Sequence, residues 1–221
     1  MAEGPPPPRT KICGLTRVED AGLAGRAGAD FVGAILSPGF RRSVEPHTAA
    51  RFPEASGRPL VAVTVDADVA ELIEVAERTG ASVLQLHGDE PVDRLAQLRN
   101  AGEWELWKAL RVRTADEVRA ALDRFGEAAD GLVLDGWHPE HRGGSGIRFP
   151  WDLVEPLRSE FPASLRFIAA GGLQPDNVAE AVQRLSPDVV DVSSGVEIEH
   201  GIKDPARVRA FIRNATRDIP S

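Results

Sequence analysis

The stretch Thr10-Lys11-Ile12-Cys13-Gly14-Leu15-Thr16 joins a short strand pattern to the start of a helix pattern. Its first part, Thr10–Cys13, lacks a strict polar–apolar alternation, which is typical of a strand buried on both faces. Thr16 and Glu19 have the capping-box spacing that marks a helix start. The turn between the two parts lacks the G-x-G-x-x-G pattern that opens many doubly wound sheets. The stretch therefore predicts a strand–helix unit and argues against an open doubly wound sheet.

The same alternation of strand and helix patterns continues almost to the end of the chain. The strand-like runs are Thr10–Cys13, Phe31–Leu36, Leu60–Val65, Ser82–Leu86, Leu106–Leu110, Gly131–Leu134, Arg166–Ala169 and Val189–Val192. The residues that share one buried helix face between two runs are Val69, Leu72, Ile73 and Ala76. Strands that alternate with helices imply a parallel sheet, and eight equal units favour closure. We therefore predict an α/β fold, a single (β/α)8 TIM barrel over residues 9–217, after a Pro-rich leader at residues 1–8.

Length and composition fit one domain and argue against several partners. The 221 residues match single α/β barrels, which commonly have about 200 to 250 residues. A net charge of −8 argues against nucleic acid and acidic membrane surfaces as partners. No apolar run is long enough to span a bilayer and no signal peptide is recognisable, so we expect a cytoplasmic protein. Cys13 is the only cysteine, which excludes an internal disulfide and a cysteine-based metal cluster.

Glycine-rich segments after the last strand-like runs predict a phosphate site. Gly171 and Gly172 follow the seventh run, and Ser193-Ser194-Gly195 follows the eighth. In (β/α)8 barrels the active site lies at the carboxyl ends of the strands, and these two loops often bind phosphate. Glycine allows backbone N–H groups to approach an anion. The turn Gly144-Ser145-Gly146 after the sixth run could add further donors. The alternative is that these glycines only form tight turns.

Two residues at strand ends are candidates for proton transfer. Asp135 stands directly at the end of the sixth run, after Leu134, where an apolar barrel mouth would disfavour its charged form and suit a general acid. The alternative role is a helix cap or a loop salt bridge. Cys13 ends the first run, and Lys11 and the following helix start would each lower the thiol pKa from about 8.5. Lys11 shares a strand face with Cys13 and lies one layer deeper. The alternative for Cys13 is an inert core cysteine.

Other chemistries remain alternatives at this point. His138, Glu140 and His141 cluster after Asp135, but they lie in a loop without ligand spacing on a helix, so we predict no metal. A metal-dependent sugar-phosphate epimerase, a Schiff-base aldolase and a non-catalytic barrel are the competing functions. A Schiff-base aldolase needs a lysine at a strand end, and neither Lys11 nor Lys108 is well placed for that role.

Several short segments stand in a characteristic order along the chain: Lys11-Ile12-Cys13-Gly14, Ser37-Pro38 with the arginines after it, Leu84-Gln85-Leu86-His87-Gly88, Leu134-Asp135, Gly143-Gly144-Ser145-Gly146, Ala170-Gly171-Gly172-Leu173 with Asn177, and Asp191-Val192-Ser193-Ser194-Gly195-Val196-Glu197 with Gly201 and Lys203-Asp204. Together these segments resemble the phosphoribosylanthranilate isomerase family, over about Lys11 to Arg213. Each segment is weak alone, but their order and spacing make the resemblance strong.

The resemblance implies an Amadori rearrangement in tryptophan biosynthesis, with no cofactor and with a small phosphorylated substrate. Asp135 would protonate the furanose ring oxygen, and Cys13 would remove the proton from sugar C2. The resemblance also implies a monomer or a homodimer. The substrate-binding residues that we predict are Arg41, Arg42, His87, Gly144, Gly171, Gly172, Ser193, Ser194 and Gly195.

The family's arginine after Ser-Pro holds the anthranilate carboxylate, a role for which a guanidinium with two parallel N–H donors is suited. Here Gly39 and Phe40 separate Pro38 from two arginines. Arg41 and Arg42 are both candidates, and we favour Arg41. The loop from Gly136 to Arg142 gives no role assignment.

Overall fold

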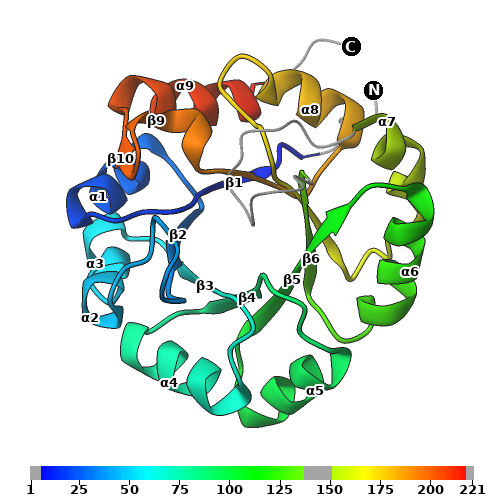
Figure 1. Ribbon diagram of the computed structural model, residues 1–221. Helices are drawn as coiled ribbons and strands as arrows, with labels where there is room; N and C mark the ends of the chain where they lie inside the picture. Colours follow the sequence, from blue (N-terminus) through cyan, green and yellow to red (C-terminus); the bar gives the residue numbers. More distant parts are fainter. Residues whose placement is uncertain (1–5, 137–150, 218–221) are drawn as a thin grey trace.

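The computed structural model describes residues 6–136 and 151–217. Its strands form a closed barrel in the order β1-β2-β3-β4-β5-β6-β7-β8, and every neighbouring pair is parallel. Helices surround the barrel (Figure 1). The predicted TIM barrel is therefore confirmed. Within the described residues, no helix has the length and apolar character needed to cross a membrane.

The barrel strands follow the predicted runs closely, and helical segments connect them. The strands are β1 (Arg9–Ile12), β2 (Phe31–Ile35), β3 (Leu60–Thr64), β4 (Val83–Leu86), β5 (Glu105–Val112), β6 (Gly131–Gly136), β7 (Arg166–Ala169) and β8 (Val189–Val192). The α-helices are α1 (Val18–Ala27), α2 (Pro46–Ala49), α3 (Phe52–Ser56), α4 (Val69–Thr79), α5 (Val92–Ala101), α6 (Ala115–Phe125), α7 (Trp151–Val154), α8 (Val178–Leu185) and α9 (Pro205–Ala215). Two 3-10 helices, η1 (Glu155–Glu160) and η2 (Ser194–Val196), and a small hairpin, β9 (Glu197–Glu199) with β10 (Ile202–Lys203), complete the described elements.

Alternate side chains of each strand fill the barrel interior, and those between them face the helices. The buried interior cluster consists of Cys13, Phe31, Val61, Val63, Val83, Trp107, Ala109, Val133, Ile168, Ala170 and Val189. Within this cluster the rings of Phe31 and Trp107 meet edge to face, with their centroids 5.1 Å apart. The interior is thus a packed core, and the strand residues beyond it form the floor of the barrel mouth.

Side-chain caps begin some of the described helices, and one predicted cap is not formed. The side chain of Asp68 accepts from the Glu71 N–H in a complete capping box, and Asp204 caps α9 ahead of Pro205. The predicted capping box of Thr16 is wrong, because α1 begins at Val18 with no side-chain cap. Instead, the Thr16 hydroxyl donates to the Gly201 carbonyl at 2.6 Å. This bond ties the turn after β1 to the β9–β10 hairpin.

Candidate active site

The two predicted proton-transfer residues lie at the same end of the barrel. Cys13 directly follows β1 and belongs to the interior cluster, and Asp135 is the penultimate residue of β6. Each is 8% exposed, so both are largely shielded from water but reach the mouth. Because all eight strands are parallel, their carboxyl ends meet at one opening. The sequence-based expectation that the thiol and the carboxyl share one barrel mouth agrees with this placement.

A missing side chain on β2 makes room for the thiol. The Cys13 N–H donates to the Val192 carbonyl at 2.8 Å, which fixes the backbone of this residue against β8. A Cβ atom on Gly33 would lie 2.9 Å from Cys13 Sγ and 3.1 Å from Lys11 Cε. Gly33 is therefore required for close packing of the thiol and the lysine stem, a role that the sequence did not indicate.

A buried ammonium group lies below the thiol. Lys11 is 0% exposed, and its Nζ donates to Asp191 Oδ2 at 2.9 Å, to Gln85 Oε1 at 2.8 Å and to Cys13 Sγ at 3.3 Å. Burial lowers the pKa of Lys11, but the charge of Asp191, the charge that Cys13 acquires as a thiolate and the hydrogen bonds to both residues raise it by more, so the net direction is upward. Lys11 therefore carries a positive charge directly beneath Cys13.

The expected lowering of the Cys13 pKa is wrong. Burial raises the thiol pKa, and the negative charge of Asp191 adds to that effect. Lys11 lowers the pKa as expected, but burial outweighs it, so the net direction is upward. The free protein therefore holds Cys13 mainly as a thiol near neutral pH. Its minor thiolate form is a stronger base than an ordinary thiolate.

The carboxyl group of Asp135 has two neighbouring nitrogen atoms. Its Oδ1 accepts from the Gly136 N–H at 2.8 Å, and its Oδ2 lies 3.5 Å from His87 Nε2. Gly171, with φ of +79°, adopts a backbone conformation that favours glycine. A Cβ atom there would lie 2.6 Å from Asp135 Oδ1 and 2.3 Å from the Gly136 nitrogen. Gly171 thus leaves the space that the carboxyl group occupies, whether or not it also binds phosphate.

The loops after β7 and β8 pack directly against each other. Gly172, with φ of +68°, continues the left-handed turn that Gly171 begins. A Cβ atom on Gly195 would lie 2.0 Å from the Leu173 carbonyl oxygen, so this contact also requires glycine. The predicted phosphate residues of both loops are half-buried; they are Gly171, Gly172, Ser193, Ser194 and Gly195. The structure brings these residues together at the edge of the mouth.

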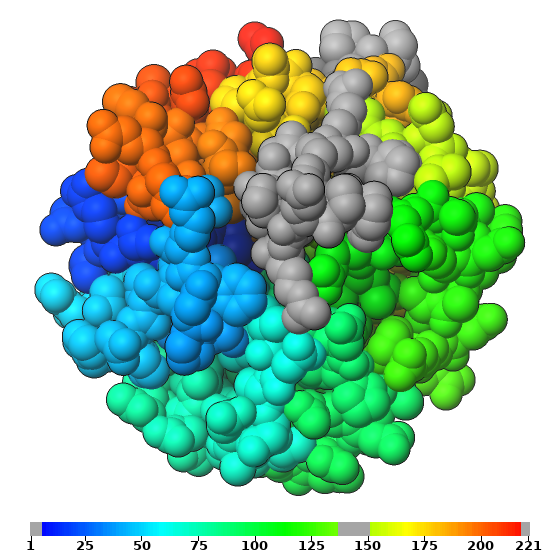
Figure 2. Space-filling model, in the orientation of Figure 1, coloured from blue at the N-terminus to red at the C-terminus, as the bar shows by residue number. Residues whose placement is uncertain are grey.

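The two candidate arginines have different environments. Arg42 donates from Nε and Nη2 to the two oxygens of Glu197, each at 2.8 Å, and its Cδ lies 2.7 Å from the Cβ position of Gly14. Figure 2 shows the light-blue segment after β2 against the orange segment after β8. Arg41 is exposed. The structure therefore places Arg42, rather than the favoured Arg41, against the ends of β1 and β8.

Glu197 holds two cations at this edge of the mouth. Lys203 Nζ donates to Glu197 Oε1 at 2.9 Å and to the Ser193 carbonyl at 3.1 Å. Burial raises the pKa of Glu197, but the hydrogen bond from Arg42 and the charge of Lys203 lower it by more. One carboxylate between two cations leaves a net positive charge here, which suits an anionic ligand. The sequence motif contained Glu197 and Lys203 but gave neither a role.

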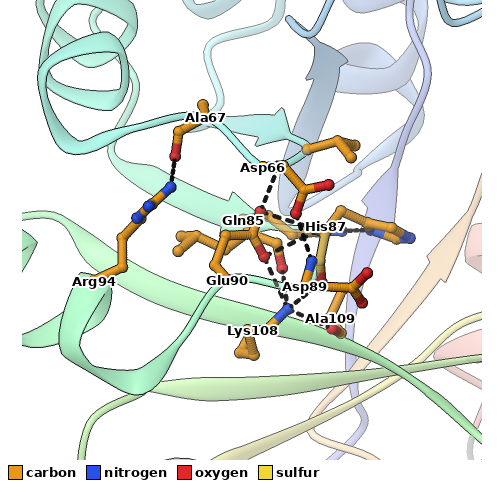
Figure 3. A network of polar contacts seen from close by, with 12 residues as sticks. Asp66, Ala67, Gln85, His87, Asp89, Glu90, Arg94, Lys108 and Ala109 are labelled. Carbon is orange, nitrogen blue, oxygen red and sulfur yellow. Dashed lines mark hydrogen bonds and ion pairs between the residues drawn. The ribbon is translucent and has the colours of Figure 1, made fainter.

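A further buried ion pair, between Glu90 and Lys108, fixes the loop after β4 (Figure 3). Glu90 Oε1 accepts from the Asp66 and Gly88 N–H groups at 2.9 and 3.0 Å, and its Oε2 accepts from Lys108 Nζ at 3.0 Å. Lys108 also donates to the Gly88 carbonyl at 2.7 Å. Since Lys108 lies between the interior residues Trp107 and Ala109, its side chain is on the outer face of β5. This arrangement holds the loop that begins at His87.

Three of the sequence-based considerations lie outside the described residues. They concern Gly144, the metal alternative at His138, Glu140 and His141, and the loop from Gly136 to Arg142 apart from its first residue.

The closed barrel, with a thiol and a carboxyl at the carboxyl ends of β1 and β6, defines an enzyme of the TIM-barrel class. The sequence model of the N-(5'-phosphoribosyl)anthranilate (PRA) isomerase family matches residues 10–214. The chain therefore belongs to this family, as its motifs predicted.

Individual relatives agree with the family match over nearly the whole chain. An N-(5'-phosphoribosyl)anthranilate isomerase from Neisseria meningitidis serogroup C is 40% identical over 214 residues, covering 95% of this chain and 97% of the relative. One from Chromohalobacter salexigens is 43% identical over 211 residues, covering 92% of each chain. The crystal structure of the Thermotoga maritima enzyme has a TM-score of 0.84 at 33% identity, covering 94% of this chain and 98% of the other.

Proposed function

We propose that this protein is an N-(5'-phosphoribosyl)anthranilate isomerase, which converts its substrate into 1-(2-carboxyphenylamino)-1-deoxyribulose 5-phosphate by an Amadori rearrangement in tryptophan biosynthesis. The placement of Cys13 and Asp135 at one barrel mouth carries the proposal, because the reaction needs one proton donor and one proton acceptor. A solved relative, 32% identical with a TM-score of 0.81, contains reduced 1-(o-carboxyphenylamino)-1-deoxyribulose 5-phosphate. The chemistry of that ligand is consistent with the proposed product.

In the proposed mechanism Asp135 acts first as the general acid. Its proton goes to the furanose ring oxygen, the bond from that oxygen to C1 breaks, and the ring opens to a protonated Schiff base. The Cys13 thiolate then removes the proton from C2, and the electron pair of that bond moves toward the cationic imine to form an enolamine. The enolamine becomes the ketone when C1 gains a proton and the C2 hydroxyl group loses one, so that the number of protons is unchanged. The imine cation is the electron sink, so the scheme contains no step that a cofactor must supply.

Loss of the anthranilate fluorescence of the substrate on mixing with purified protein tests this function directly. We expect turnover that persists with excess chelator. Binding of the substrate without turnover would contradict the proposal and favour a non-catalytic barrel, and activity lost on chelation would favour a metal-dependent enzyme.

We propose that the loops after β7 and β8 bind the substrate phosphate. The half-buried residues Gly171, Gly172, Ser193, Ser194 and Gly195 would supply backbone N–H groups and hydroxyls. Among the described residues the buried Ser193 hydroxyl has no hydrogen-bond partner, and a phosphate oxygen would satisfy it. Arg42 and Lys203 both pair with the single carboxylate of Glu197, and the remaining positive charge would favour an anion nearby.

We propose Arg42 as the residue that binds the anthranilate carboxylate. Glu197 uses Nε and Nη2 of Arg42, so this ion pair fixes the guanidinium while Nη1 remains available to a ligand. A guanidinium that is already oriented loses less conformational entropy on binding than the exposed side chain of Arg41.

Arg42→Ala should therefore raise KM by roughly 10- to 100-fold, as expected for a lost hydrogen bond to a charged group. Arg41→Ala is the matched control and should change KM only slightly. Steady-state kinetics with the substrate and with its aniline analogue, which lacks the carboxylate, make the measurement specific. Only Arg42→Ala should lose the preference for the carboxylate; loss of that preference in Arg41→Ala instead would reverse the assignment.

The raised pKa of the buried thiol can be measured in the free protein. Because Cys13 is the only cysteine, the ultraviolet absorbance of its thiolate can be followed against pH with Cys13→Ser as the blank. Burial disfavours the anion, so thiolate should form at a pH above that of an ordinary thiol. A midpoint below the ordinary thiol pKa would show that Lys11 outweighs burial and would contradict the upward shift of the Cys13 pKa.

A further inference from the structure

The amide of Gln85 has only one orientation that suits Lys11. An ammonium group has three donors and no acceptor, and Lys11 uses them on Asp191, Gln85 and Cys13. The Gln85 atom 2.8 Å from Lys11 Nζ must therefore be the oxygen. A flipped amide would place two donors against each other in a site that is closed to water.

This orientation determines which nitrogen of His87 carries a proton. With its oxygen on Lys11, the Gln85 Nε2 group lies 2.8 Å from His87 Nδ1 (Figure 3). An amide nitrogen can only donate, so Nδ1 must accept and cannot carry hydrogen. A neutral imidazole has one proton, which is then on Nε2.

The Nε2 atom faces the proposed general acid. It lies 3.5 Å from Asp135 Oδ2, while the other carboxyl oxygen accepts from the Gly136 N–H. A proton on Nε2 presents a donor to the carboxyl group and favours the carboxylate that forms when Asp135 releases its proton. With the opposite tautomer, a lone pair on Nε2 would face the carboxyl group and compete with the substrate for that proton.

We propose that Gln85 is a positioning residue that holds His87 in the Nε2–H tautomer, so that His87 assists Asp135 and does not take its proton. The catalytic part of this inference rests on the proposed isomerase function, whereas the tautomer follows from the hydrogen bonds alone. The backbone supports the same geometry. The His87 N–H donates to the Thr64 carbonyl at 2.8 Å, and the Glu90–Lys108 pair holds the next residues.

The tautomer is measured directly in the wild-type protein. Long-range proton–nitrogen NMR spectra distinguish a protonated from an unprotonated ring nitrogen, and the spectrum of His87→Gln assigns the signals of one histidine among five. We expect the Nε2–H form at neutral pH. An Nδ1–H form or a doubly protonated ring would overturn the proposal. Absence of isomerase activity in the wild type would refute the proposed function and leave this result standing.

Gln85→Glu tests the consequence for catalysis. Glutamate has nearly the same shape, but it places an acceptor against Nδ1 and should draw a proton to that nitrogen. We expect an NMR spectrum with a protonated Nδ1 and a kcat lowered by roughly 10- to 100-fold, the effect of losing a hydrogen bond to a charged group. The change in KM should be much smaller. An unchanged kcat in a variant with a protonated Nδ1 would overturn the catalytic part of the proposal.

His87→Gln is the matched control. A glutamine there keeps a donor near the Nε2 position but has no ring tautomer that Gln85 can control. Gln85→Glu should therefore have little further effect on kcat in the His87→Gln background, which is strong non-additivity. Full additivity would show that Gln85 acts through Lys11 alone and would overturn the proposal.

Gln85→Met, which adds no buried charge, provides a second variant if Gln85→Glu does not fold. We expect both neutral tautomers of His87 in this variant. A pure Nε2–H form would show that Gln85 does not determine the tautomer and would overturn the proposal.

Discussion

Cys13→Ser should lower kcat by about 10²- to 10⁴-fold, the usual contribution of a positioned general base. Serine is nearly isosteric and can still accept a hydrogen bond from Lys11. The hydrogen bond between Lys11 and Asp191 should therefore remain intact. The hydroxyl is a far weaker acid than a thiol and supplies almost no anion near neutral pH. The loss should therefore appear in kcat, with KM nearly unchanged.

Two further measurements make the Cys13 result specific. Alkylation of the wild type reaches only this thiol, because the chain has a single cysteine, and saturating substrate should slow it. The alkylated protein should be inactive while its thermal unfolding remains cooperative. Near-wild-type turnover in the Cys13→Ser variant would show that Cys13 is a buried core residue and not the general base.

The barrel, and the meeting of the Cys13 and Asp135 strand ends at one opening, were predictable because they depend on local patterns. The short run at Thr10–Cys13 and the run that ends at Asp135 each mark a buried strand, and parallel strands must place their carboxyl ends together. The buried hydrogen bonds of Lys11 beneath the barrel mouth were not predictable in this way. Lys11 meets Asp191 from 180 residues away, and the register and closure of the barrel determine such contacts.

Gln85 shows most clearly what the sequence pattern leaves out. It is a polar residue inside an apolar run, two positions before His87, and in an extended chain that spacing places both side chains on the same side. The pattern thus contains a signal that an interior polar group is present. It cannot indicate that the partner is Lys11, 74 residues earlier, or which amide atom faces it. The same holds for Arg42, whose partner Glu197 is 155 residues away.

The direction of the Cys13 pKa illustrates a second limit. The sequence showed a lysine two residues from the thiol, and that proximity alone lowers the pKa. The opposing effect depends on how completely the barrel encloses the thiol, which is a property of the whole fold. Burial outweighs the nearby charge here, so inference from neighbouring residues gave the wrong sign.

Asp135→Asn should reduce kcat by about 10²- to 10⁴-fold, the range for a general acid. The amide oxygen can still accept from the Gly136 N–H, and the side chain still fits the space above Gly171. It has no proton to transfer, so the furanose ring oxygen would have to leave without protonation. KM should change little, and binding of the reduced product analogue should be nearly unaffected, since that ligand has no ring to open.

Asp130→Asn is the control for this variant, because Asp130 lies at the opposite end of β6. Its Oδ2 accepts from the Leu106 N–H and from Arg99, each at 2.7 Å, so its loss should lower the melting temperature. It is far along the strand from the mouth, so kcat should stay close to that of the wild type. Should Asp135→Asn instead lose stability and keep its turnover, Asp135 would be a structural residue, and the proton for ring opening would have to come from another group at the mouth. A selective loss of kcat at Asp135, with a selective loss of stability at Asp130, would separate the two ends of one strand into a catalytic end and a structural end, as the barrel architecture requires.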